Sequence, residues 1–276
     1  MSGPSAGAPA GFGRGMLPAW AKPLAGRLLS LPPVFRSWEL YAASRYPRPP
    51  ATDGNGLPIP DRLRMVQVVA HADWRTFLQT GAATIESFDA LLTRHGGGFD
   101  RAGAVLDFGC GCGRLIRHLP ARTDAALYGT DLNPRLSGWC AGHLPGQFSA
   151  NALHPPLAYE DGQFDVLYAL SVFTHLREAT QRAWLAEFAR ILKPGGRAII
   201  TFHDEHQPGA DAALRTELAA SGFLVRRDAM EGSNLPATYQ THAYMNAMAA
   251  PAFTVLETVP SPETPFGQAM ALLRRA

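Results

Sequence analysis

Short apolar segments alternate with amphipathic segments through the middle of this chain, and this alternation limits its possible folds more than any other feature. The apolar runs have the length and composition of buried strands, and they cover residues 104–109, 125–133, 146–151, 164–173 and 197–204. The segments between them predict helices, including residues 112–120 and, most clearly, residues 176–196. Strands that alternate with helices predict a parallel sheet with helices on both faces.

The last two apolar runs, residues 253–259 and 268–275, are separated only by a short proline-rich loop. This loop leaves no room for the crossover helix that two parallel neighbouring strands need. We therefore expect these two strands to pair antiparallel at one edge of the sheet.

The remaining segments predict how the chain is organised around this sheet. Residues 1–15 consist mainly of Gly, Pro, Ala and Ser, and they predict a disordered tail. Residues 16–95 predict a helical extension that caps the sheet domain, with two helices meeting where Gly81 interrupts the apolar spacing. The sheet domain then covers residues 96–276. Within it, residues 222–250 exceed an ordinary connection and predict a substrate lid.

Composition argues against several partners and compartments. The net charge of +2 lacks the clustered basic excess of nucleic-acid-binding proteins, and no apolar run approaches the roughly 18 residues that cross a bilayer. The three cysteines form no disulfide framework and fit a reducing compartment. We expect a cytoplasmic protein that binds neither nucleic acid nor membrane, and a homodimer remains open.

The segment "VLDFGCGCGRL", residues 105–115, carries three glycines at alternate positions directly after the first predicted strand. Ligands of open α/β sheets bind beyond the carboxyl ends of the strands, and glycines there let the backbone approach a ligand. A dinucleotide-binding loop needs G-x-G-x-x-G, but Arg114 occupies the position of its third glycine. The Gly-Lys-Ser/Thr of a P-loop is also missing. The spacing therefore disfavours both NAD and nucleoside triphosphates.

Asp131 ends the second predicted strand, 18 residues after Gly113. A carboxylate at this position can accept hydrogen bonds from both hydroxyls of a ribose. The loop and the acid together predict a site for an adenosine-type ribose with no pyrophosphate beside the glycines.

Four segments, "VLDFGCGCGRL", "GTDLNP", "FDVLYALSVFTHL" and "ILKPGGRAIITFH", resemble the successive motifs of class I S-adenosylmethionine-dependent methyltransferases. The resemblance covers roughly residues 60–276. It implies a Rossmann-like, seven-stranded, mostly parallel sheet with an antiparallel terminal strand, and S-adenosylmethionine as the cofactor. The cofactor-binding residues that it implies are Asp107, Gly109, Cys110, Gly111, Gly113, Asp131, Leu132, Asn151, Ala152 and Leu170.

Two departures from common metal and cofactor patterns bear on this interpretation. Asn151 stands where many family members place an aspartate on the adenine amino group, although its side-chain carbonyl can also accept from that group. Cys110 and Cys112 form C-x-C without a second Cys/His pair, which is not the spacing of a metal site. The cluster of His203, Asp204 and His206 fits a solvated loop better than a metal site, so we predict no metal.

Methyl transfer requires the acceptor atom to be held in line with the sulfur–carbon bond, and a protonated acceptor also needs a base. His175, after the fourth strand, is the first candidate for this base, with a helix-start residue that shapes the loop as the alternative. His203 with Asp204, after the fifth strand, is the second candidate. The predicted acceptor-binding residues are Tyr239 and His242 in the lid and Trp74 and Phe77 in the helical extension, with simple packing as the alternative.

The sequence thus favours an enzyme that transfers a methyl group to an oxygen or nitrogen of a small molecule, such as a secondary metabolite or a modified sugar. The segment "LSVFTHL" after the fourth strand lacks the Asn/Asp-Pro-Pro-Tyr/Phe motif of enzymes that methylate DNA bases. Two alternatives stay open. One is an NAD-dependent oxidoreductase, and the other is a cofactor-binding scaffold subunit without turnover.

Overall fold

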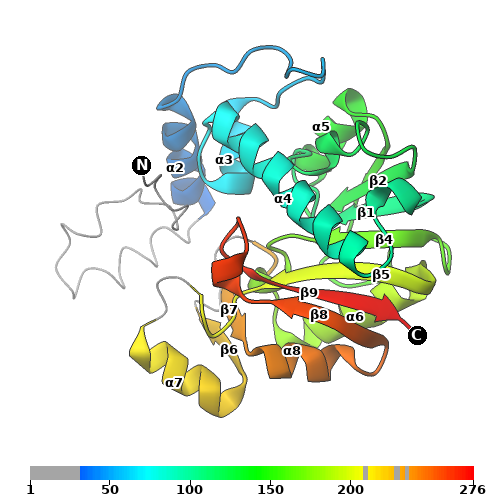
Figure 1. Ribbon diagram of the computed structural model, residues 1–276. Helices are drawn as coiled ribbons and strands as arrows, with labels where there is room; N and C mark the ends of the chain where they lie inside the picture. Colours follow the sequence, from blue (N-terminus) through cyan, green and yellow to red (C-terminus); the bar gives the residue numbers. More distant parts are fainter. Residues whose placement is uncertain (1–31, 208–210, 227–230, 234–235) are drawn as a thin grey trace. The chain divides into compact units, whose positions relative to one another are not determined.

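The computed structural model describes residues 32–207, 211–226, 231–233 and 236–276 (Figure 1). The tail expected at residues 1–15 lies outside these ranges. The described residues fall into two compact units, which divide between Gln79 and Thr80.

The first unit is helical. It contains α2 (Pro32–Ser44), α3 (Arg62–Val69) and the start of α4 (Trp74–Arg94), which continues into the second unit. The carboxylate of Asp61 accepts a hydrogen bond from the Arg64 amide (3.1 Å) and so caps the N-terminus of α3. At its other end, α3 stops at Ala70, which has a left-handed backbone (φ 61°).

The second unit is built on the predicted seven-stranded sheet, whose strand order is β3-β2-β1-β4-β5-β9-β8. The strands are β1 (Ala104–Phe108), β2 (Ala126–Asp131), β3 (Gln147–Ala150), β4 (Phe164–Ala169), β5 (Leu192–Phe202), β8 (Phe253–Val259) and β9 (Ala269–Arg275). The first five are parallel, and β9 runs antiparallel to both β5 and β8. The mixed sheet expected from the sequence, with its antiparallel pair at one edge, is therefore confirmed.

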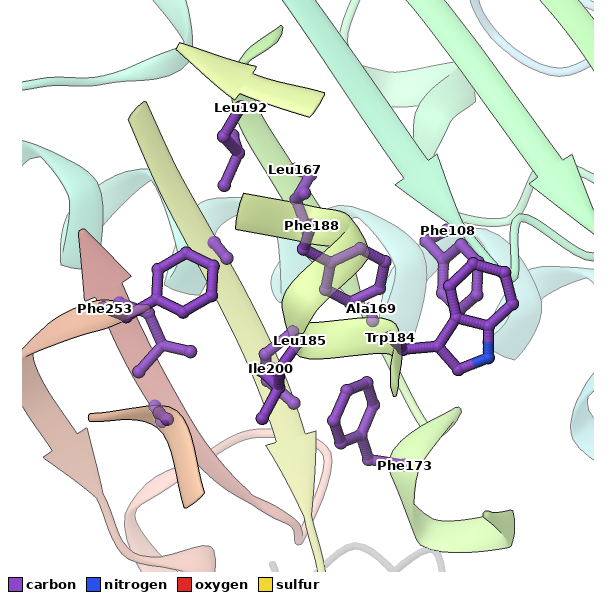
Figure 2. Packing of buried hydrophobic residues seen from close by; sticks show 14 of the residues in the cluster. Phe108, Leu167, Ala169, Phe173, Trp184, Leu185, Phe188, Leu192, Ile200 and Phe253 are labelled. Atoms are coloured by element: carbon purple, nitrogen blue, oxygen red, sulfur yellow. The ribbon is translucent and has the colours of Figure 1, made fainter. Parts of the chain in front are cut away.

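Helices cover both faces of this sheet, and aromatic side chains fill the space between the layers. The helices of the second unit, besides α4, are α5 (Pro134–His143), α6 (Glu178–Ile191), α7 (Ala212–Ser221) and α8 (His242–Ala249). Phe88 of α4 packs against Tyr168 of β4 on one face (ring centroids 5.6 Å apart). Trp184 of α6 packs against Phe108 of β1 on the other face (4.5 Å; Figure 2). Among the helices of the described ranges, none combines the length and apolar composition needed to cross a membrane.

The segment predicted as a lid forms its own small substructure. Strands β6 (Phe223–Arg226) and β7 (Ala237–Gln240) pair antiparallel in a separate two-stranded sheet. Helix α8 follows β7 directly.

Three expectations about helix boundaries are wrong, each for a physical reason visible in the structure. No α-helix follows the glycine loop within residues 112–120, which form turns and one 3₁₀ turn (Ile116–His118), because Gly113 has a left-handed backbone (φ 76°). Helix α6 ends at Ile191, ahead of Pro194, whose ring is incompatible with a continuing helix. The residues around Pro194 instead belong to β5.

The third correction concerns Gly81, which lies inside α4 rather than between two helices. The chain breaks earlier, between Val69 and Trp74. A Cβ on Gly81 would lie 2.3 Å from the backbone oxygen of Arg114. Gly81 is therefore a point of close approach between α4 and the segment that follows the glycine loop.

This contact predicts that a glycine-to-alanine substitution has opposite effects on the stability of the fold at Gly81 in α4 and at Gly138 in α5. Gly81→Ala is expected to destabilise the fold by roughly 1–3 kcal/mol, since the new methyl group overlaps a backbone oxygen. Gly138→Ala is the matched control, because Gly138 lies in α5 with no atom within 4 Å of the added Cβ. There, alanine is expected to stabilise by up to about 1 kcal/mol. Thermal unfolding followed by circular dichroism measures both, and equal shifts in Tm would contradict the contact.

Candidate functional site

The glycine loop between β1 and the 3₁₀ turn has backbone dihedral angles that residues other than glycine rarely adopt. Gly109, Gly111 and Gly113 have φ values of 80°, 54° and 76°. A Cβ on Gly109 would lie 2.4 Å from Val172 Cγ2, and one on Gly113 would lie 2.2 Å from Leu144 Cδ1. The loop therefore turns tightly at the carboxyl edge of the sheet and presents backbone there, as a cofactor cradle requires.

Asp131, at the end of β2, is bound to this loop. Its Oδ2 accepts a hydrogen bond from the Gly111 amide (2.8 Å), and its Oδ1 accepts one from the Asn133 amide (2.8 Å). Burial raises the pKa of this carboxyl, while the two amides act in the opposite direction. Each oxygen keeps a further acceptor position, so the geometry suits two ribose hydroxyls.

The residues expected at an adenine ring lie close to Asp131. Leu132 is 39% exposed, which is unusual for a large apolar side chain and leaves its surface available for stacking. Asn151 follows β3, and its backbone amide donates a hydrogen bond to the Asp131 carbonyl (3.1 Å). The side chain of Asn151 accepts from the Thr130 hydroxyl (2.9 Å) and donates to the Ala152 carbonyl (2.7 Å). Its amide orientation is thereby fixed, with one acceptor position on Oδ1 remaining.

Asp107 lies on β1, beneath the glycine loop, and is almost entirely buried. Its Oδ2 has no hydrogen-bond partner within the described residues, nor has the hydroxyl of the neighbouring Tyr168. Burial and the nearby Asp131 raise the pKa of Asp107, the Tyr168 hydroxyl and the Arg114 guanidinium oppose the shift, and the resulting pKa is about 7. A buried acceptor without a partner beside the glycine cradle fits a ligand that brings donors to this point, as the amino-acid end of S-adenosylmethionine would.

Three buried cysteines, two in the glycine loop and one in α5, lie close to the loop backbone. Cys110, Cys112 and Cys140 are all buried free thiols. The Sγ atoms of Cys110 and Cys140 lie 3.7 Å and 3.5 Å from the Gly111 carbonyl oxygen. The interaction with the Cys140 sulfur and burial raise the pKa of the Cys110 thiol, and burial raises that of Cys112. The thiols of Cys110 and Cys112 are therefore poor nucleophiles, and they help to shape the loop.

His175 lies in a 3₁₀ turn (Phe173–His175) after β4 and contacts the chain ahead of β7. Its Nδ1 is 2.7 Å from the carbonyl oxygen of Pro236, which can only accept a hydrogen bond. Nδ1 therefore carries the proton, and in the neutral ring the lone pair lies on Nε2. Burial lowers the pKa of His175, so the neutral form persists near pH 7.

His203 follows β5 and lies close enough to His175 for their charges to interact. Burial and the nearby His175 lower its pKa, the Thr238 backbone and Asp204 oppose the shift, and the resulting pKa is about 4. Its ring packs on that of Tyr239 in β7 (centroids 5.1 Å apart), and its carbonyl accepts from the Gln240 amide (2.9 Å). The ends of the adjacent strands β4 and β5 thus bring the uncharged imidazoles of His175 and His203 close together, next to strand β7 of the predicted lid.

His242, the first residue of α8, is tied to a buried carboxylate. Its Nε2 lies 3.0 Å from Asp204 Oδ2, and the same carboxylate accepts from the amide and hydroxyl of Ser261 (3.0 Å and 2.6 Å). Asp204, Glu205 and His242 bring three potential metal-ligand atoms within 4.8 Å of one another. The oxygens of Asp204 are already satisfied by protein donors, so this network joins β5, α8 and the β8–β9 connection without requiring a metal.

Trp74 and Phe77, the other two predicted acceptor-binding residues, belong to the first unit. Both lie at the start of α4. The Arg75 guanidinium lies over the Trp74 ring, 4.5 Å from its centroid, and Phe77 is fully buried.

Sequence reasoning missed a set of polar residues at the end of β4. Leu170, predicted to contact the cofactor, is half-buried and begins the turn that leaves this strand. The next residue, Ser171, has a left-handed backbone (φ 57°) and hydrogen-bonds with Thr201 and Gln268. No motif marks this set, because Gln268 is 97 positions away from Ser171.

Comparison with known proteins agrees with this fold. Residues 106–200 match the family described as "Methyltransferase domain". An uncharacterized methyltransferase of Synechocystis is 29% identical over 38% of this chain and 48% of its own length. An O-methyltransferase of Penicillium expansum is 26% identical over 42% of this chain and 43% of its own length. The chain thus spans less than half the length of these curated relatives.

Solved structures agree on the fold. The 1,6-didemethyltoxoflavin-N1-methyltransferase of Burkholderia thailandensis, determined with S-adenosylhomocysteine bound, shares the fold with a TM-score of 0.53 and 19% identity. The match covers 79% of this chain and 92% of that protein. The family match identifies residues 106–200 as a methyltransferase domain, and the solved structure shares its fold.

Removal of the Asp131 carboxylate is expected to weaken cofactor binding. Hydrogen bonds to a charged group contribute roughly 1.5–3 kcal/mol each, so Asp131→Ala should lower the affinity for S-adenosylhomocysteine at least about tenfold. Isothermal titration calorimetry measures this directly.

Asp165→Ala is the matched control for that experiment. Asp165 also accepts two backbone amide hydrogen bonds, from Gly103 and Ala104 (both 2.9 Å), but at the amino end of the sheet. Asp165→Ala should destabilise the fold and leave the affinity for S-adenosylhomocysteine unchanged. Equal losses of affinity in the two variants would place the ribose away from Asp131.

The raised pKa of Asp107 predicts a pH-dependent stability. The native state retains a proton on this carboxyl up to about pH 7, whereas the unfolded chain loses it near pH 4. The stability that Asp107 contributes is therefore present below about pH 4 and is lost as pH rises to about 7, by an amount on the order of 4 kcal/mol. Without cofactor, Asp107→Asn should match the parent protein near pH 4 and exceed its Tm at pH 8. A constant difference in Tm across this range would contradict the shift.

Proposed function

We propose that this chain transfers a methyl group from S-adenosylmethionine to an oxygen or nitrogen of a small molecule, such as a secondary metabolite or a modified sugar. The observation that carries the proposal is the bond between the Asp131 carboxylate and the Gly111 amide. It brings a ribose-binding acid against a glycine cradle that lacks the spacing for a pyrophosphate.

The residues that would hold the cofactor are those at the carboxyl ends of β1, β2, β3 and β4. Asp131 would bind the ribose, and Leu132 would pack on the adenine. The buried, unpartnered Oδ2 of Asp107 would accept from the amino-acid end. The sulfonium of the bound cofactor supplies an activated methyl group. The remaining task of the protein is to position an acceptor and remove its proton.

His175 is the candidate for this proton removal. The Pro236 carbonyl holds the proton on Nδ1, so Nε2 has the lone pair that a general base needs. Burial keeps the imidazole uncharged near neutral pH by lowering its pKa. His203 lies beside it as a second uncharged imidazole and can orient the acceptor, with the Tyr239 ring providing an apolar surface.

The names of similar proteins support an oxygen or nitrogen acceptor. One relative is named an O-methyltransferase, and one structural neighbour is an N1-methyltransferase with 1,6-didemethyltoxoflavin bound. The alternative of an NAD-dependent oxidoreductase is disfavoured by Arg114, which occupies the position of the third dinucleotide glycine. A scaffold without turnover remains the second alternative.

A transfer assay tests the proposal. The purified chain is incubated with S-adenosylmethionine labelled in its methyl group and a panel of phenols, hydroxylated polyketides, sugars and amines. Incorporation of label into at least one acceptor, with equimolar S-adenosylhomocysteine, is the expected result. Tight cofactor binding with no transfer to any class would favour the scaffold, and reduction of NAD with an alcohol substrate would favour the oxidoreductase.

His175→Asn separates a catalytic from a structural role of this residue. Asparagine keeps a donor for the Pro236 carbonyl but cannot act as a base, so kcat should fall by roughly 10²–10⁴-fold while the affinity for S-adenosylhomocysteine changes little. In the parent enzyme, kcat should fall with an apparent pKa below 6.5 as pH decreases, because burial lowers the pKa of His175.

His143→Asn is the control for this variant. His143 also places Nδ1 against a backbone carbonyl, that of Trp139 (2.8 Å), but it lies at the exposed end of α5. It should leave kcat unchanged. If His175→Asn lowers kcat by only a fewfold, His175 shapes the loop and does not act as the base.

A further inference from the structure

Ser171 has a strained backbone directly after β4. Its φ of 57° lies in the left-handed region, which residues with a side chain rarely adopt. Ala70 is the other non-glycine residue with positive φ in the described ranges, and it is explained by the end of α3. Ser171 caps no helix, so other contacts must hold it in this conformation.

A closed ring of three hydrogen bonds holds Ser171. Its amide donates to the Thr201 hydroxyl (2.8 Å), which donates to Gln268 Oε1 (2.8 Å). Gln268 Nε2 in turn donates to the Ser171 hydroxyl oxygen (2.6 Å). Thr201 is fully buried in β5, so this ring is anchored in the centre of the sheet.

Gln268 is itself fixed by the connection between β8 and β9. Its carbonyl accepts a hydrogen bond from the Thr264 hydroxyl (2.7 Å). Phe266, in the same connection, packs edge-on against Phe88 of α4 (5.7 Å). The side chain of Gln268 therefore reaches Ser171 from a rigid support.

The strained residue lies where the chain reaches the candidate cofactor site. Val166 to Ala169 are buried, whereas Leu170, Ser171 and Val172 are half-buried at the carboxyl edge of the sheet. A Cβ on Gly109 would lie 2.4 Å from Val172 Cγ2, so this turn packs directly on the glycine cradle. A change in the backbone of Ser171 would move both Leu170 and Val172 against that cradle.

We infer that Gln268 and Thr201 are positioning residues for the cofactor site: they hold Ser171 in its left-handed conformation and so set the position of the turn Leu170–Val172 against the glycine loop. The inference rests on the proposed function, because it assumes that this loop binds S-adenosylmethionine. It assigns a role to the β8–β9 connection, which contains none of the residues expected to contact cofactor or acceptor.

A double-mutant cycle tests this inference, with S-adenosylhomocysteine as the probe. Gln268→Met keeps a similar shape but cannot form the ring, and it should weaken binding about tenfold. Ser171→Gly removes the strain, because glycine adopts this conformation without support. In the Ser171→Gly background, Gln268→Met should therefore change the affinity by less than twofold. Gln147→Met, on the exposed strand β3, is the control and should have no effect.

Thermal unfolding without ligand gives a second readout of the same cycle. Gln268→Met should lower Tm by several degrees in the parent background and by clearly less in the Ser171→Gly background. An equal loss of affinity and of Tm in both backgrounds would show that Gln268 acts through other contacts and would overturn the inference. The proposed function fails separately, if the parent protein itself does not bind S-adenosylhomocysteine; the Tm cycle then still decides whether Gln268 supports the conformation of Ser171.

Discussion

The carboxylate of Asp131 links two loops that are far apart in sequence, and the candidate site depends on this link. One oxygen binds the Gly111 amide in the loop after β1, and the other binds the Asn133 amide at the start of α5. Adjacent parallel strands β1 and β2 place these loops side by side. The strand order thus puts a carboxylate next to a glycine backbone in left-handed conformations, and in the proposed function this combination favours a ribose over a pyrophosphate.

The candidate base depends on a second set of contacts, made by the predicted lid. The Pro236 carbonyl fixes the proton of His175, the Thr238 hydroxyl donates to the Leu176 carbonyl (2.9 Å), and the Gln240 amide donates to the His203 carbonyl (2.9 Å). The strand β7 is therefore bonded to the residue that follows the 3₁₀ turn after β4 and to the end of β5. In the proposed reaction, Pro236 of the predicted lid thus leaves Nε2 of His175, rather than Nδ1, free to take the proton of the acceptor.

The sequence predicted the sheet and its antiparallel edge because strand composition and connection length are local properties. It failed at helix boundaries where distant contacts decide, as at Gly81, whose lack of a side chain is explained only by the Arg114 carbonyl. The placement of Asp131 against the glycine loop agrees with the motif spacing. The tautomer of His175 and the tie between His242 and Asp204 required coordinates, since both depend on partners far away along the chain.

The ring of Ser171, Thr201 and Gln268 was beyond sequence reasoning for the same reason. Its members come from three strands or their ends. Ser171 and Thr201 lie within two of the quoted motif segments, but neither motif indicates that Gln268 is their partner. At Ser171, hydrogen bonds stabilise a left-handed backbone conformation that glycine usually adopts in proteins. The β8–β9 connection therefore bears on the candidate site although it contributes no residue to the cofactor motifs.

The central claim is that the glycine loop and Asp131 form a site for an adenosine-type cofactor without a pyrophosphate. Side-by-side calorimetric titrations of the parent protein with S-adenosylhomocysteine and with NADH test it most directly. The account predicts saturable binding of S-adenosylhomocysteine with one site per chain, and no measurable heat of binding for NADH at the same concentrations. Binding of NADH with no response to S-adenosylhomocysteine would contradict it.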